Sequence, residues 1–280
     1  MSESDHMQGY RSETLPNGPK YVAIHFSADE DKDHDWELAK SQGVPIREWK
    51  REMGMHDDIY DGQPVFADYS DARHCPEKIR DKGIPIMPQS CYIGGWDGGL
   101  VPAFVLLQIT LDFQIHAILE VVTEGDDPME TFVPKVQRAI EQRIPGRYDE
   151  IYHTGDPTIW NRTPGTGESS GAYAKRRFGV NIRPSTNIPD VRKSAVTWSL
   201  VNRLDNGRER FILDPTECPT LRKGFNGAYQ LEVSTRGDTT GPGRILAEPL
   251  KNGYSHVHDA HQYAVIAARK FCEGKLNLRL

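Results

Sequence analysis

Short apolar runs alternate with amphipathic stretches along the chain, and this pattern predicts an α/β protein. The clearest run is 92–108, YIGGWDGGLVPAFVLLQ, in which glycines surround Asp97 and an apolar segment follows. Short apolar runs bounded by glycine are typical of buried strands. Asp-Gly is also a strong hairpin signal, so a simple turn at Asp97–Gly98 is the competing interpretation. We expect a strand that runs through Asp97.

The rest of the pattern supplies further strands and helices. Residues 101–109 and 114–122 predict neighbouring antiparallel strands. Residues 148–154 form another short run that ends just before Asp156. Apolar residues at helical spacing predict helices over 128–144, 189–203 and 256–271. Shorter elements are expected as helices at 171–178 and 215–229 and as strands at 180–183, 211–213, 229–233 and 245–248.

The amino-terminal third differs in composition. Residues 1–20 are polar and predict a poorly ordered arm, whereas 21–26 predict a short strand. Helix starts are expected near Asp33 and Pro45. Residues 68–89 are polar and rich in proline, which is typical of a linker. We therefore expect an N-terminal arm and linker over 1–88 and the main domain over 89–280.

Composition narrows the class of protein. The 280 residues are 37% hydrophobic and 26% charged, which suits one large globular domain with an appendage. A net charge of -6 excludes a uniformly basic surface, but it is compatible with a local basic groove beside acidic ligands. The four cysteines form no CxxC pair, so neither a zinc site nor a disulfide framework is expected. A reducing cytosol is the expected compartment. No apolar run is long enough to span a bilayer, so we expect no membrane association.

Three carboxylates occupy comparable places in the predicted fold. Asp97 and Asp156 lie at strand ends, and Asp259 lies in the first turns of the last helix. Carboxylates that converge at one sheet edge are the hard ligands that suit Mg²⁺ or Mn²⁺. Two such ions ~4 Å apart activate water and stabilise a leaving oxygen in phosphodiester hydrolysis. Taken singly, each aspartate is more often a cap or turn residue, so the ordered trio carries the prediction.

The same blocks resemble a known family. GGWDGGLVPAFVLLQ, TGDPTIW and PLKNGYSHVHDAHQYA surround the three aspartates, and NIPDVRKSAVTWSLVNRL lies between the last two. With these blocks in this order, the chain resembles the C-terminal nuclease domain of tailed-phage large terminase subunits. The resemblance implies a ribonuclease-H-like α/β fold, with a mixed central sheet flanked by helices and an N-terminal helical or irregular arm. It matches Asp97, Asp156 and Asp259 to the metal-binding acidic triad of the family.

The resemblance also implies a function. We expect a metal-dependent endonuclease that cuts double-stranded phage DNA concatemers during genome packaging, with two Mg²⁺ or Mn²⁺ ions, in the cytoplasm of the infected bacterial host. No GxxxxGK[ST] phosphate loop occurs in the chain. A separate ATPase motor subunit is therefore expected as a partner, together with a small terminase and a portal. Whether the chain is a separately encoded nuclease or a truncated form stays open.

Other residues have weaker signals. His256 is a candidate metal ligand, with a capping or packing role equally compatible with the pattern. His258 is expected to cap or pack near the start of the last helix, and Glu120 to be a solvated strand end. The candidate contacts to the DNA backbone are Arg192, Lys193, Arg236, Arg244 and Lys251.

Two other functions fit the same sequence. The first is another ribonuclease-H-like DNA enzyme, such as a junction resolvase or a strand transferase, which a comparison of branched and linear duplexes would distinguish. The second is a non-catalytic docking subunit of the packaging motor, which would not need to bind Mn²⁺.

Overall fold

The computed structural model describes residues 63–123, 125–162, 167–234 and 244–276, and two short strands near the N-terminus. The chain divides into two compact units, Met1–Tyr60 and Asp61–Leu280. In the first unit, β1 (Tyr10–Glu13) pairs antiparallel with β2 (Tyr21–Ile24). This confirms the strand predicted at 21–26 and adds one within the predicted unstructured arm. The helix starts expected near Asp33 and Pro45 lie outside the described residues.

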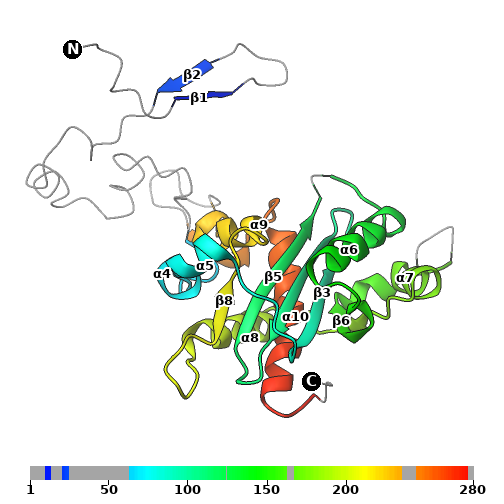
Figure 1. Ribbon diagram of the computed structural model, residues 1–280. Coiled ribbons are helices and arrows are strands. Elements are labelled where there is room, and N and C mark those ends of the chain that lie inside the picture. The colour runs from blue at the N-terminus through cyan, green and yellow to red at the C-terminus, as the bar shows by residue number, and fades with distance from the viewer. Residues whose placement is uncertain are drawn as a thin grey trace, which may run out of the picture. The chain divides into compact units, whose positions relative to one another are not determined.

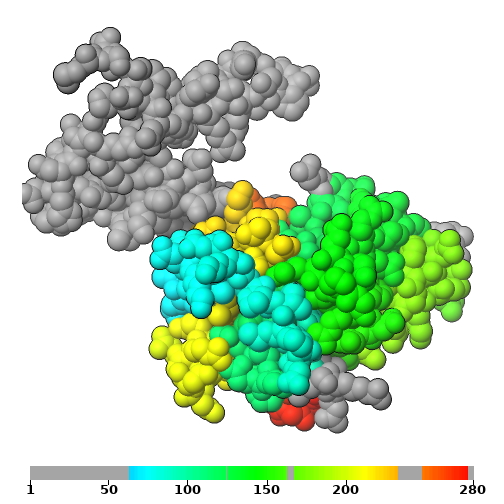
Figure 2. Space-filling view, viewed as in Figure 1, coloured from blue at the N-terminus to red at the C-terminus, as the bar shows by residue number. Residues whose placement is uncertain are grey.

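The sequence predicts a boundary near Pro88, whereas the second compact unit begins at Asp61. Residues 63–88 contain α4 (Asp71–His74) and α5 (Glu77–Lys82) instead of an irregular linker. Asp71 accepts a hydrogen bond from Arg222 Nη2 at 2.5 Å, and the Tyr69 ring stacks on Phe225 with 4.6 Å between ring centroids. Figure 2 shows this segment packed beside the part of the chain that contains β8 and α9. The segment is polar in sequence because one face carries ion pairs while the other joins the core.

A six-stranded mixed sheet organises the second unit, in the order β7-β6-β3-β4-β5-β8. Strands β3, β4 and β5 form an antiparallel meander, while β6 runs parallel to β3, β7 parallel to β6, and β8 parallel to β5. The strands are β3 (Cys91–Asp97), β4 (Ala103–Ile109), β5 (Ile115–Val122), β6 (Ile151–Gly155), β7 (Arg183–Pro184) and β8 (Phe211–Leu213). This sheet confirms the predicted α/β class with a mixed central sheet, and β7 is shorter than the strand predicted at 180–183.

The stretch around Asp97 combines both interpretations of its sequence. β3 runs into Asp97 and ends there, and β4 begins at Ala103 as its antiparallel neighbour. The Asp-Gly pair therefore starts a hairpin connection, and the aspartate is also the last residue of a buried strand. The Asp97 carboxylate thus lies at the C-terminal end of a central strand, which is paired with β4 on one side and with β6 on the other.

Helices cover both faces of the sheet (Figure 1). On one face, α6 (Met129–Arg143) packs on alternate β3 residues such as Tyr92 and Trp96. On the other face, α8 (Pro189–Val201) and α10 (Ser255–Cys272) pack against Ile93 and its neighbours. Residues of β3 are buried along its whole length because both sides are covered.

Shorter elements complete the second unit. They are η1 (Tyr148–Glu150), η2 (Pro157–Trp160), α7 (Ser170–Phe178), α9 (Pro219–Lys223), the π-helical turn η3 (Gly224–Ala228), β9 (Leu231–Ser234) and β10 (Arg244–Pro249). The segment predicted as one helix at 215–229 is α-helical only over Pro219–Lys223 and continues as η3, inside which Gly227 has a φ of 123° that favours glycine. β9 and β10 form a separate antiparallel pair, as the sequence predicts.

A buried polar network ties β5 to its neighbours. His116 Nε2 lies 2.9 Å from Gln114 Oε1, and His116 Nδ1 lies 3.2 Å from Gln108 Nε2. Both contacts are satisfied when the ring is neutral, with Nε2 donating and Nδ1 accepting. Burial lowers the pKa of His116 to about 4, because a charged ring would lose its hydration.

This network predicts a pH-dependent stability. Above its ordinary pKa His116 is neutral in both states; as the pH falls from about 6.5 towards 4, only the unfolded chain takes up the proton. The wild type should therefore lose up to about 1.4 kcal/mol per pH unit in this range relative to His116→Gln. Urea unfolding of both proteins at several pH values measures the difference. Parallel pH profiles for the two proteins would contradict the buried neutral ring.

Candidate functional site

Two parallel strands bring Asp97 and Asp156 to the same edge of the sheet. Trp96 of β3 is in register with Gly155 of β6, so the aspartate that follows each of them lies at the same level. The backbone N–H of Asp156 donates to the Trp96 carbonyl at 3.1 Å. This bond extends the ladder one step beyond β6 and fixes the two aspartates as neighbours.

Asp156 also shapes the turn that follows it. Its Oδ1 accepts a hydrogen bond from the Thr158 N–H at 2.8 Å, which caps η2, and Pro157 supplies the first helical position. Ile159 of this turn lies against the hairpin after β3, where a Cβ at Gly98 would be 2.2 Å from its Cγ2. Glycine at this position therefore lets the two site loops meet.

The third aspartate is brought to the sheet by a close helix–strand contact. A Cβ at Gly95 would lie 2.1 Å from the Ala260 carbonyl oxygen and 2.8 Å from the Ala264 Cβ. With glycine in β3 and alanines in α10, the helix backbone rests directly on the strand. Asp259 is next to Ala260 in α10, so this contact sets its height above the end of β3.

The charges at this edge are strongly coupled. Asp97 is only 6% exposed, and burial raises the pKa of its carboxyl, with the charges of Asp259 and Asp156 acting in the same direction. His256 opposes this shift, since its Nδ1 lies 2.9 Å from Asp97 Oδ2. The same hydrogen bond raises the pKa of His256. The structure therefore pairs the candidate ligand His256 with the first carboxylate.

Asp259 is compensated by two cations. Arg192 of α8 donates to Oδ1, and Lys251 Nζ lies 3.0 Å from Oδ2. The Arg192 guanidinium also stacks over the Tyr263 ring, 4.6 Å from its centroid. Its side chain is 13% exposed and is engaged by Asp259, and the DNA-backbone contact expected of Arg192 stays a prediction.

The other predicted residues are placed as follows. Lys193 is exposed on α8. Arg236 and the side chain of Arg244 lie outside the described residues. His258 packs in the interior near the start of α10, as expected, and stacks on Tyr229 with 4.5 Å between ring centroids.

Glu120 is not a solvated strand end. Its two carboxylate oxygens accept hydrogen bonds from the N–H groups of Thr220 and Leu221 at 2.7 and 2.8 Å. These contacts cap α9, and burial raises the pKa of the Glu120 carboxyl. The sequence hides this role because Glu120 and α9 are a hundred residues apart.

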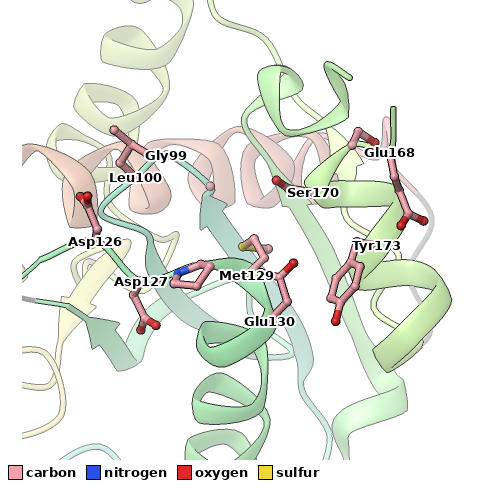
Figure 3. A pocket seen from close by; sticks show the side chains of 12 residues that line it. Gly99, Leu100, Asp126, Asp127, Met129, Glu130, Glu168, Ser170 and Tyr173 are labelled. Atoms are coloured by element: carbon pink, nitrogen blue, oxygen red, sulfur yellow. The ribbon is translucent and has the colours of Figure 1, made fainter. Parts of the chain in front are cut away.

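A hollow of about 680 Å³ opens beside the hairpin after β3. Figure 3 shows Asp126 and Asp127 on one side of it, and Tyr173 and Glu168 on the other. None of the described residues that line it is a lysine or an arginine. No local pattern in the sequence predicts this hollow, because its walls come from the hairpin after β3, the loop before α6 and the start of α7.

The residues at the sheet edge suit a divalent cation in their chemistry. Three carboxylates lie near enough for the charges of Asp156 and Asp259 to raise the pKa of Asp97. Within the described part of the chain, no three His, Cys, Asp or Glu side chains are gathered around one point as in a metal site. Both oxygens of Asp259 are engaged, by Arg192 and by Lys251.

Comparison with protein-family models and with curated proteins finds no match. Among solved structures, the large terminase of a thermophilic bacteriophage aligns with 86% of this chain, with a TM-score of 0.50 and 13% identity. The chain shares the fold of a phage large terminase. It spans about half of that protein, 54% of its length. The large terminase nuclease of thermophilic phage G20c, solved with bound cobalt, aligns with 72% of this chain and 96% of its own, with a TM-score of 0.45 and 13% identity.

Among the described residues, no helix combines the length and the apolar character needed to cross a membrane.

The contact at Gly95 gives a direct test of how the site is built. Gly95→Ala should push α10 away from β3 and lower the free energy of unfolding by about 1–3 kcal/mol, because the added methyl meets backbone that cannot move aside. Gly99→Ala is the matched control, since a Cβ there meets no atom within 4 Å. Chemical denaturation measures both. Equal stability of the two variants would show that the helix does not rest on the strand.

Proposed function

We propose that this protein is a metal-dependent endonuclease that cuts double-stranded DNA during packaging of a tailed-phage genome. The observation that carries the proposal is the convergence of Asp97, Asp156 and Asp259 from two parallel strand ends and one helix. The fold shared with the phage large terminase supports it.

In this proposal the three aspartates hold two divalent cations, Mg²⁺ or Mn²⁺. Such ions, when bound, supply an activated water and stabilise the leaving oxygen of a phosphodiester. Asp97 and Asp156 provide the rigid part of the ligand set, because the sheet fixes their spacing. His256 orients Asp97 through its hydrogen bond, and Arg192 orients Asp259. No protein nucleophile is needed for the reaction.

The distribution of charge favours one direction of approach for DNA. The hollow beside Gly98 and Gly99 is lined by carboxylates, of which Asp127 and Glu168 are ion-paired with Lys135 and Arg176, and its described lining offers no lysine or arginine to a phosphate. Lys193 of α8 and Lys251 before α10 are exposed and positively charged, so the duplex would approach over this pair of helices. Arg236 and Arg244 are proposed as further backbone contacts from the sequence alone. Contacts to phosphate do not read bases, so low sequence specificity is expected.

The wider setting of the proposal follows from packaging. The substrate is concatemeric phage DNA in the cytoplasm of the infected bacterial host. An ATPase motor subunit, a small terminase and a portal are the expected partners. The cut would separate one genome length from the concatemer.

Single substitutions at the carboxylates test the proposed activity. Asp97→Asn, Asp156→Asn and Asp259→Asn should each reduce plasmid cleavage with Mn²⁺ by at least about a hundredfold, because each removes a metal-ligand charge. Asp81→Asn, an exposed change on α5, is the control and should cleave like the wild type. Gel analysis of supercoiled plasmid gives the rates. Wild-type cleavage by all three site variants would refute the assignment.

The path of the DNA has its own test. Lys193→Gln should lower the slope of log affinity against log salt by about 0.9, because one phosphate contact is lost. Binding of a duplex oligonucleotide in Ca²⁺ at several salt concentrations measures the slope. An unchanged slope would place the DNA elsewhere.

A further inference from the structure

The two oxygens of Asp259 are neutralised by cations of very different solvent exposure. Arg192 holds Oδ1, and Lys251 holds Oδ2 at 3.0 Å. The Arg192 side chain is 13% exposed, whereas that of Lys251 is 73% exposed. The carboxylate is therefore held by one interior partner and one partner at the surface.

Arg192 cannot leave Asp259 without a large penalty. Its guanidinium lies over the Tyr263 ring, and its Nε is buried without a hydrogen-bond partner among the described residues. Taking away its carboxylate would leave a buried, uncompensated charge, which is among the costliest changes a protein interior can undergo. Arg192 thus fixes the orientation of Asp259.

Lys251 is free to leave in a way that Arg192 is not. Its ammonium is solvated, and an exposed lysine ion pair adds little free energy. The backbone beside it is nevertheless anchored, since Asn252 Oδ1 accepts from the Tyr254 N–H and Asn252 Nδ2 donates to the Ala228 carbonyl, both at 2.9 Å. The side chain can therefore swing away while its attachment point stays in place.

We propose that Lys251 is an exchangeable counter-cation of the site, which occupies Asp259 Oδ2 and yields it to a divalent cation, while Arg192 stays as the positioning residue. This inference rests on the proposed function, because it assigns the metal to the same carboxylates. The exchange keeps the buried carboxylates compensated at every stage, first by the ammonium and then by the metal. Lys251 thereby sets the affinity of the site for metal.

The charge of Lys251 opposes metal binding, so its removal should strengthen binding. The ammonium of Lys251 competes with the metal for Asp259 Oδ2 and repels a cation that approaches this oxygen. Lys251→Gln should therefore bind Mn²⁺ about five- to tenfold more tightly than the wild type. Lys251→Arg keeps the charge and should bind within about twofold of the wild type. A purely structural lysine would give the opposite order, with the glutamine variant binding more weakly.

The measurement is calorimetric titration of the full chain with Mn²⁺ in the absence of DNA. Lys78→Gln, which removes an exposed charge on α5, is the matched control and should leave the affinity unchanged. Tighter binding by Lys251→Gln alone supports the exchange. Equal or weaker binding by that variant, with a wild type that binds Mn²⁺, overturns the exchange and leaves the nuclease proposal standing. A wild type that binds no Mn²⁺ overturns both.

Discussion

The contact between the backbone of α10 and strand β3 is the constraint on which the site depends. At Gly95 there is no room for a single methyl group, because the Ala260 carbonyl would lie 2.1 Å from it. A larger residue at either place would lift the helix and carry Asp259 away from Asp97. The remaining parts of the second unit are arranged around this pair, with α8 supporting α10 on one face and α6 closing the other.

Much of the fold could be predicted from the sequence, because the strands and helices of the sheet layer have clear apolar periodicity and are bounded by glycine or proline. The three-strand meander, the strand before Asp156 and the last helix follow from apolar runs that are local in the sequence. Residues 63–88 could not be placed in the same way. Their helices are short, and they are stabilised by distant partners such as Arg222 and Glu209, which leave no local signal.

The candidate site, too, could be predicted only in part. That three aspartates gather at one edge follows from strand order and is visible in the sequence. Which cation faces which carboxylate depends on how α8 lies on α10, and no periodicity encodes that. Arg192 reads as a surface charge on an amphipathic helix, yet in the fold it is an interior partner of Asp259. Glu120 is a similar case, since its role as a helix cap depends on a strand-to-helix contact across a hundred residues.

The cap that Asp156 makes on η2 limits the coordination chemistry of that residue. Its Oδ1 is directed at the Thr158 N–H by the turn, so Oδ2 is the oxygen without a partner among the described residues. A metal ion bound by both oxygens of Asp156 would have to break the hydrogen bond to Thr158. This would loosen the turn that packs against Gly98. In the proposed role of Asp156 as a metal ligand, keeping the cap would leave Oδ2 as the oxygen available to the metal, so the turn favours contact through one oxygen.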